Sequence, residues 1–95
     1  MQKTVSVVIT THNRPDYLKE SLAAVLKQTV PPKEVFVIDD GSSVSYEEVL
    51  SLFPAEHFTY IKTPVASGAN TARNLGIDKS SADIIAFLDD DDVWD

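Results

Sequence analysis

The chain has 95 residues, 43% of them hydrophobic, which is enough for one compact domain with one core. It has no cysteine, so disulfide bonds and thiolate metal sites are excluded. The formal net charge is −7 and no basic patch is visible, which argues against a nucleic-acid partner. No apolar run approaches the roughly 18 residues of a membrane span, and no signal peptide is visible. We therefore expect a cytoplasmic protein.

Strand-like and helix-like patterns alternate along the chain. Apolar, β-branched runs such as VSVVI predict strands buried on both faces of a parallel sheet, and apolar residues at helical spacing predict the helices between them. Asn13 is a suitable N-cap for the first helix, and Gly76 indicates that the third helix packs closely on the sheet. In chain order we predict strand 5–9, helix 14–28, strand 34–38, helix 45–53, strand 58–62, helix 67–80 and strand 83–88.

This alternation predicts an α/β fold, namely a doubly wound, mostly parallel sheet with flanking helices. We predict the spatial strand order 3-2-1-4, with the first strand at the centre. In such sheets, ligands bind beyond the carboxyl ends of the strands. Polar segments follow three of the predicted strands: TTHNR at 10–14, DDGSS at 39–43 and DDDD at 89–92. We expect these segments to converge at one edge of the sheet.

The acidic run at 89–92 is the strongest sign of a site. The seven aspartates of segments 39–40 and 89–95 account for the whole net charge of −7. As a plain tail the run would be solvated, but it directly follows a predicted strand. In an extended chain Asp89 and Asp91 share one face, and Asp90 and Asp92 share the other. Either Asp-x-Asp pair suits Mg²⁺ or Mn²⁺, which bind carboxylates together with substrate phosphates.

The other candidates also have plainer interpretations. Asp39 and Asp40 stand in good turn sequence, so they could simply begin a turn. His12 suits an exposed loop. Arg73 in isolation is more easily explained as a solvated helix residue than as a ligand-binding one. It is, however, one of only two arginines, and a guanidinium would be a suitable partner for phosphates.

Four blocks of the sequence carry a family resemblance over nearly all 95 residues. VSVVITTHNRPDYLKESLAAVLKQT, EVFVIDDGSS, GANTARNLGI and ADIIAFLDDDDVW resemble the nucleotide-binding half of the family 2 glycosyltransferases, which have the GT-A fold. The resemblance implies a hexosyltransferase of cell-surface polysaccharide biosynthesis. Its donor would be a nucleotide-diphospho-sugar, with a family-level lean to UDP, bound through Mn²⁺ or Mg²⁺.

The resemblance also assigns residues by position. It implies donor binding by Thr10, Thr11, His12, Asp39, Asp40, Arg73, Asp89 and Asp90, and metal binding by Asp89 and Asp91. The family often has tyrosine or phenylalanine where His12 stands, so a base-stacking role is less secure there. Because four aspartates are consecutive, the alternative metal pair Asp90 and Asp92 stays open.

Family members continue past this motif into an acceptor-binding half that carries the general base. The resemblance therefore implies that residues 1–95 are the donor-binding half of a longer transferase, cut after the Asp-x-Asp motif. The full-length enzyme would act at the inner face of the membrane on a saccharide or lipid-linked acceptor, and the 95 residues alone would transfer nothing. A non-catalytic nucleotide-binding module is one alternative. A sugar nucleotidylyltransferase-like domain is another, but TTHNRPDY lacks its glycine-rich loop.

Overall fold

A computed structural model of the chain describes residues 4–27, 32–63 and 69–89. The elements are β1 (Val5–Thr11), α1 (Pro15–Leu26), β2 (Glu34–Asp39), α2 (Glu47–Leu50), the 3-10 helix η1 (Ala55–His57), β3 (Thr59–Lys62), α3 (Ala69–Lys79) and β4 (Ile84–Asp89). Within these ranges, each helix is too short or too polar to cross a membrane.

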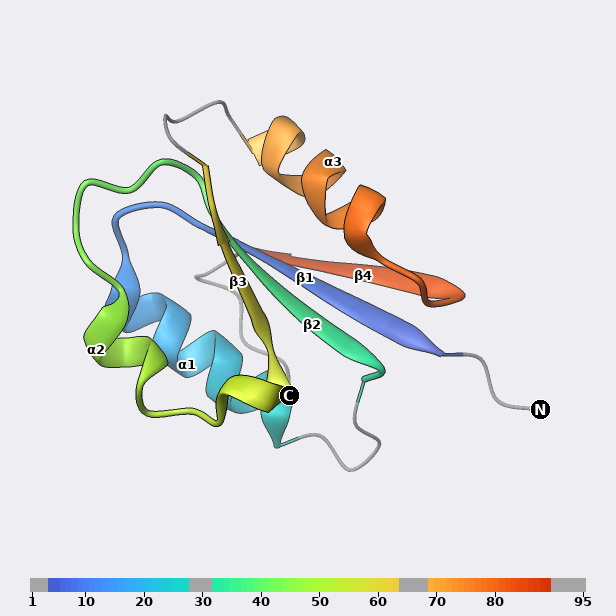
Figure 1. The fold of residues 1–95 in the computed structure, drawn as a ribbon, viewed down its shortest axis with the longest axis horizontal. Helices are drawn as coiled ribbons and strands as arrows, with labels where there is room; N and C mark the ends of the chain where they lie inside the picture. Colours follow the sequence, from blue (N-terminus) through green and yellow to red (C-terminus); the bar gives the residue numbers. More distant parts are fainter. Residues whose placement is uncertain (1–3, 28–31, 64–68, 90–95) are drawn as a thin grey trace.

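The four strands form one parallel sheet in the order β3-β2-β1-β4 (Figure 1). This confirms the predicted strand order and the central place of β1. Thr10 of β1 is in register with Ile38 of β2 on one side and with Asp89 of β4 on the other. The carboxyl ends of these three strands therefore lie at the same edge of the sheet.

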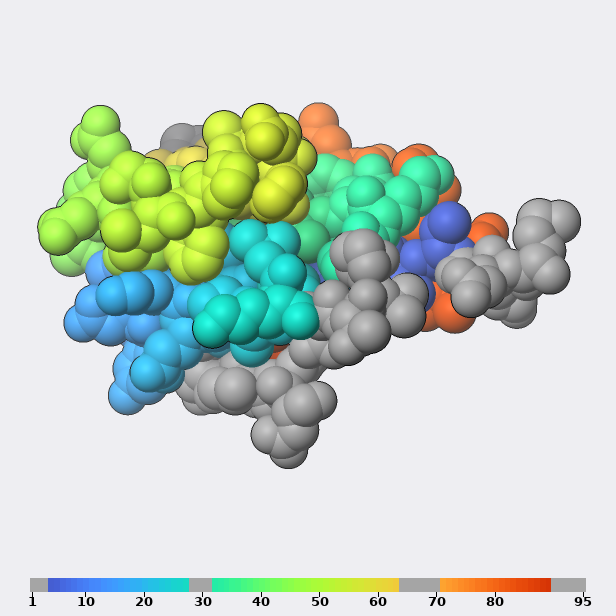
Figure 2. Space-filling model, turned by 90° about the horizontal axis from the view of Figure 1, so that it is seen from below, coloured from blue at the N-terminus to red at the C-terminus, as the bar shows by residue number. Residues whose placement is uncertain are grey.

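Successive strand residues pack against opposite layers, as the period of two requires. Val7 and Ile9 belong to the core cluster that includes α1, whereas Val8 packs with Phe36 and with Ala72 of α3. Figure 1 shows α1 and α2 on one face of the sheet and α3 on the other. Figure 2 shows α1 and the segment that carries α2 packed side by side. Both faces are covered at the two central strands, which explains why β1 and β2 are buried along almost their whole length.

Gly76 marks the close approach of α3 to the sheet. A Cβ atom at this position would lie 2.5 and 2.8 Å from the two methyl carbons of Val8. Real side chains do not pack at such distances, so the backbone of α3 can lie this near to β1 only because residue 76 has no side chain. The predicted close packing at Gly76 is confirmed.

Two local predictions were wrong. The helix predicted over 45–53 is the single turn Glu47–Leu50. Beyond it, the backbone N–H groups of Leu52 and Phe53 bond to carbonyl oxygens three residues earlier, as in a 3-10 helix, and not four residues earlier. Asn13 is not the N-cap of α1, since Arg14 takes that position without a side-chain bond. Asn13 instead has a positive φ of 54°, a conformation that asparagine tolerates better than most residues. The side-chain oxygen of Asn13 accepts a hydrogen bond from the backbone N–H of Ser43, which lies in the loop after β2 and not in α1.

Candidate functional site

A polar pocket of about 270 Å³ lies at the carboxyl edge of the sheet. Three of its walls come from the ends of β1, β2 and β4, which are far apart in the sequence. Its lining residues are Thr10, Thr11, His12, Arg14, Asp40 and Asp89. The three predicted polar segments thus meet, as far as their residues are described.

Asp89 joins β4 to its neighbours at this edge. One oxygen of its carboxylate accepts a hydrogen bond from the Thr10 hydroxyl at 3.0 Å and lies 3.2 Å from Nη2 of Arg73. The side chains of Arg73 and Asp89 are 35% and 46% exposed, so solvent and ligands can reach both. Arg73 is therefore directed at the edge of the pocket and is not merely a solvated helix residue.

The two adjacent aspartates after β2 differ in their surroundings. Asp40 lines the pocket, whereas Asp39 is fully buried and does not line it. The Asp39 carboxylate accepts hydrogen bonds from the backbone N–H of Ser42, at 3.0 Å, and from the hydroxyl of Tyr60. The plainer interpretation, that this residue begins a turn, accounts for these contacts of Asp39. Because Asp39 does not line the pocket, its arrangement gives no support to the predicted contact between Asp39 and a nucleotide-sugar.

Tyr60 is the partly buried partner of Asp39 and lies on the edge strand β3. Burial, and then the hydrogen bond to the Asp39 carboxylate, raises the pKa of Tyr60 well above its ordinary value of 10.0. The phenol therefore keeps its proton and acts as the donor to Asp39. This contact anchors the turn after β2 to the neighbouring strand.

His12 is held in a defined orientation at the pocket wall. Its Nδ1 lies 2.7 Å from the backbone carbonyl oxygen of Asp40, and its Nε2 lies 3.3 Å from Nδ2 of the Asn13 side chain. A carbonyl oxygen can only accept, so Nδ1 carries the proton and Nε2 accepts from the amide. The neutral Nδ1–H tautomer satisfies both contacts. The imidazole thereby links the loop after β1 to the loop after β2.

Arg14 also lines the pocket and was not among the predicted binding residues. Its guanidinium carbon lies 5.8 Å from the centre of the Tyr17 ring, within the range of a cation–π contact. A signal was available in the sequence, because Arg14 directly follows TTHN and is the second of the two arginines. It adds a positively charged residue to a lining that also contains Asp40 and Asp89.

The predicted metal pair is only partly described. Asp90, Asp91 and Asp92 lie outside the described residues, so neither register of the pair can be compared with the structure. Within the described ranges, no group of three or more histidine, cysteine, aspartate or glutamate side chains could hold a metal ion. Asp89 offers one carboxylate of the pair, and oxygen is the ligand type that Mg²⁺ and Mn²⁺ prefer.

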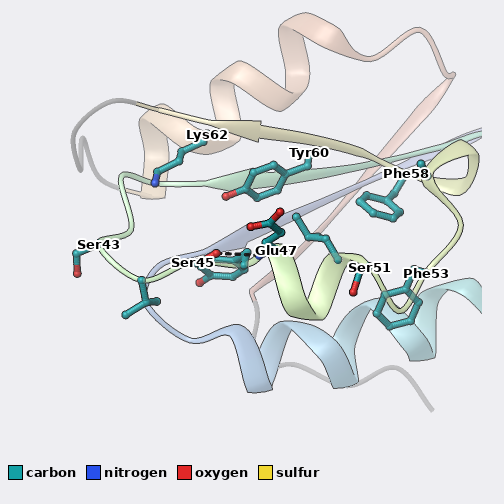
Figure 3. A pocket seen from close by; sticks show the side chains of 12 residues that line it. Ser43, Ser45, Glu47, Ser51, Phe53, Phe58, Tyr60 and Lys62 are labelled. Atoms are coloured by element: carbon teal, nitrogen blue, oxygen red, sulfur yellow. Dashed lines mark hydrogen bonds between the residues drawn. The ribbon is translucent and has the colours of Figure 1, made fainter.

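A larger cavity of about 700 Å³ lies between α2 and β3 and was not predicted. In Figure 3, Tyr60 projects from β3 toward Glu47 on α2, and Phe58 lies just before β3. Phe53 lies near the opposite end from Lys62. Aromatic rings and hydroxyl groups make up most of its lining. None of the predicted site residues lines this cavity, so we take the smaller polar pocket as the candidate site.

A doubly wound parallel sheet with a polar pocket beyond the ends of its central strands is an architecture that binds nucleotides. Comparison with known proteins identifies the family. Residues 6–95 match the family described as Glycosyl transferase family 2, and the chain belongs to this family. The family predicted from the sequence is confirmed.

Two curated relatives are about one third identical to this chain over the aligned residues. The putative teichuronic acid biosynthesis glycosyltransferase TuaG of Bacillus subtilis is 32% identical over 92 residues. WfgD of Escherichia coli, a UDP-Glc:alpha-D-GlcNAc-diphosphoundecaprenol beta-1,3-glucosyltransferase, is 34% identical over 90 residues. Each match covers 95% of this chain and 36% of the relative. The chain thus spans little more than a third of the length of these two relatives.

Solved structures show the same fold. TarS 1–349 of S. aureus in complex with UDP is similar with a TM-score of 0.83 and 26% identity, over 95% of this chain and 28% of that chain. The mannosyltransferase PcManGT of Pyrobaculum calidifontis, in complex with GDP-Man and Mn²⁺, is similar with a TM-score of 0.87 and 22% identity. That match covers 99% of this chain and 29% of that chain. The predicted GT-A fold is confirmed.

Proposed function

We propose that the polar pocket binds the nucleotide-diphospho-sugar donor of a glycosyltransferase, and that the donor is a UDP-sugar. The observation that carries this proposal is the meeting of His12, Asp40 and Asp89 around one pocket at the carboxyl edge of the sheet. Family membership and the UDP complex of the similar TarS support it. In the full-length enzyme the sugar would pass to a saccharide or lipid-linked acceptor, as the name of the relative WfgD suggests.

Each part of the donor has suitable partners in the pocket. Thr10, Thr11 and His12 would contact the nucleoside, and the Asp40 carboxylate would accept hydrogen bonds from its N–H or hydroxyl groups. Arg14 and Arg73 would contact the diphosphate, because guanidinium groups bind phosphate oxygens with charge-assisted hydrogen bonds. In this proposal Asp39 supports the turn and does not contact the donor.

Mn²⁺ or Mg²⁺ would be held by Asp89 with Asp91, or by Asp90 with Asp92 in the alternative register. The carboxylate of Asp89 suits such an ion, and the similar PcManGT is bound with Mn²⁺. Held by these carboxylates, the ion would supply positive charge to the diphosphate leaving group. Without it, the carboxylates of Asp40 and Asp89 would repel the diphosphate.

Residues 1–95 would bind and orient the donor without transferring the sugar. In this proposal the acceptor site and the general base belong to the rest of the enzyme, since the relatives TuaG and WfgD are much longer than this chain. A cytoplasmic location at the inner face of the membrane belongs to the same proposal. So does a role in cell-surface polysaccharide biosynthesis, which the name of the relative TuaG supports.

Calorimetric titration of UDP, GDP and dTDP, with Mn²⁺ and with EDTA, tests the site, the base and the metal together. We expect UDP to bind best, and Mn²⁺ to strengthen its binding by a coupling of about 1–3 kcal/mol. Equal UDP affinity in Mn²⁺ and EDTA would exclude the metal bridge. Failure of all three nucleotides to bind would exclude the donor site.

Turnover assays of the full-length enzyme with labelled UDP-sugars and a panel of acceptors then test catalysis. We expect transfer by the full-length enzyme and none by residues 1–95. A full-length protein that binds UDP but transfers no sugar would instead be a non-catalytic nucleotide-binding module.

A further inference from the structure

Two side chains that do not line the polar pocket join the two loops that form it. The first pocket loop, residues 12–14, follows β1 and carries His12. The second pocket loop, residues 40–46, follows β2 and carries Asp40. Tyr46 belongs to the second loop and bonds to the first, whereas Asn13 belongs to the first and bonds to the second.

Tyr46 reaches the first pocket loop from the hydrophobic core. Its side chain is only 2% exposed, and its hydroxyl accepts a hydrogen bond from the backbone N–H of Arg14 at 2.9 Å. The same hydroxyl lies 2.7 Å from Oγ1 of Thr11, to which it can donate its own proton. One buried phenol thus holds the chain on both sides of His12.

Asn13 makes the opposite connection. Its side-chain oxygen accepts hydrogen bonds from the backbone N–H groups of Ser43, at 2.8 Å, and Val44, at 3.4 Å. Its own backbone N–H donates to the hydroxyl of Ser42 at 2.8 Å. These bonds hold Asn13 at a positive φ of 54°, which costs energy for a residue other than glycine. Such a conformation persists only where the surroundings enforce it, and it concentrates at ligand sites.

We propose that Tyr46 and Asn13 are positioning residues for donor binding. Together they clamp the two pocket loops at the separation at which one ligand can contact His12 and Asp40 at once. This inference rests on the proposed function, because it needs a donor in the pocket. Neither side chain lines the pocket, so both act through the backbone and side chains that they hold.

Binding measured on folded protein separates this role from a purely structural one. A residue that only stabilises the fold changes the unfolding temperature but leaves the affinity of the folded protein unchanged. A residue that organises the site also weakens binding, because the ligand must then order the loops itself.

The test compares three variants of residues 1–95 by calorimetric titration with UDP in Mn²⁺. Tyr46→Phe removes only the clamping hydroxyl. Asn13→Gly keeps a residue that accepts positive φ but removes the amide, and because Asn13 is exposed this variant should fold even if Tyr46→Phe does not. Tyr17→Phe is the matched control, since Tyr17 is 51% exposed and its hydroxyl has no protein partner among the described residues. Circular dichroism at the titration temperature confirms that each variant is folded.

We expect Tyr46→Phe and Asn13→Gly each to raise the Kd for UDP roughly three- to tenfold, the equivalent of one organising hydrogen bond. Tyr17→Phe should bind like the wild type. The clamp would be overturned if folded Asn13→Gly, and Tyr46→Phe where it folds, bound UDP with wild-type affinity. The proposed function would still stand. If the wild type itself binds no UDP, the proposed function fails, and the clamp fails with it.

Discussion

Nη2 of Arg73 lies 3.2 Å from Oδ1 of Asp89, and this contact joins the middle of α3 to the end of β4. The same carboxylate oxygen accepts the hydroxyl of Thr10, so three elements meet at one atom. Arg73 partly offsets the charge of Asp89, which lines the polar pocket together with Asp40. Any anion that binds through a metal at Asp89 would also come within reach of the Arg73 guanidinium.

Arg73→Ala should therefore weaken UDP binding in Mn²⁺ by roughly 10- to 100-fold, the usual effect of losing a hydrogen bond to a charged group. Arg73→Lys should fall between alanine and the wild type, because it keeps the charge but loses the planar fork. Lys79→Ala, at the exposed end of α3, is the control and should bind UDP normally. Titration calorimetry measures all three. Unchanged UDP affinity in Arg73→Ala would remove this residue from the donor site.

Asp91→Ala should abolish most of the gain in UDP affinity that Mn²⁺ provides, because one carboxylate alone is a poor ligand set for the ion. Asp95→Ala should keep the full gain, since we expect Asp95 to be solvated. The measurement is the ratio of UDP affinities in Mn²⁺ and in EDTA. If Asp92→Ala abolishes the gain and Asp91→Ala does not, the metal pair is Asp90 with Asp92.

Gly76→Ala should destabilise the fold by about 1–3 kcal/mol, because the new methyl group would overlap the methyl carbons of Val8. This cost should outweigh the better helix propensity of alanine, which is worth about 1 kcal/mol. Asn74→Ala, at an exposed position of the same helix, is the control and should be neutral or stabilising. Chemical denaturation provides the comparison. Adding Val8→Ala should relieve part of the Gly76→Ala cost, and a stable Gly76→Ala single variant would contradict the close approach.

Glu34 should make the stability of the fold depend on pH. Its carboxylate accepts hydrogen bonds from the hydroxyl of Ser6 and the backbone N–H of Ser81, both at 2.6 Å. The bond from Ser6, followed by that from Ser81, lowers the pKa of Glu34 below its ordinary value of 4.5. The unfolded chain therefore binds this proton more readily than the folded chain. The stabilisation is complete above pH 4.5 and is lost as the pH falls through the lower, folded pKa.

Glu34→Gln should therefore flatten the acid side of the stability profile, since glutamine keeps an acceptor oxygen but cannot be protonated in this range. The free energy of unfolding, measured by denaturant titration from neutral pH to about pH 3, provides the test. A fall as steep as that of the wild type would show that Glu34 contributes nothing to the pH dependence.

Several features of the molecule follow from the amino-acid sequence by itself. Buried strands such as VSVVI and the helical patterns between them determine the alternation of elements, and the rules of parallel sheets then predict the order 3-2-1-4. Thr10, Asp40 and Asp89 stand at strand ends, and parallel strands end at a common edge. Their positions in the sequence were therefore enough to predict that they lie around one site. Gly76 within the third predicted helix likewise indicated that this helix packs closely on the sheet.

Only the tertiary structure decided how the loops at that edge are held. The sequence could not tell which of Asp39 and Asp40 lines the pocket, because the answer depends on where β2 ends relative to Tyr60 of the neighbouring strand. Nor could it show that Tyr46 bonds to Arg14, 32 residues away, in place of a local cap. The periodicity of apolar residues shows which face of one helix or strand is buried, and the residues of that element are enough to define it. A hydrogen bond between two loops depends on how separate elements pack, and no local pattern encodes that geometry.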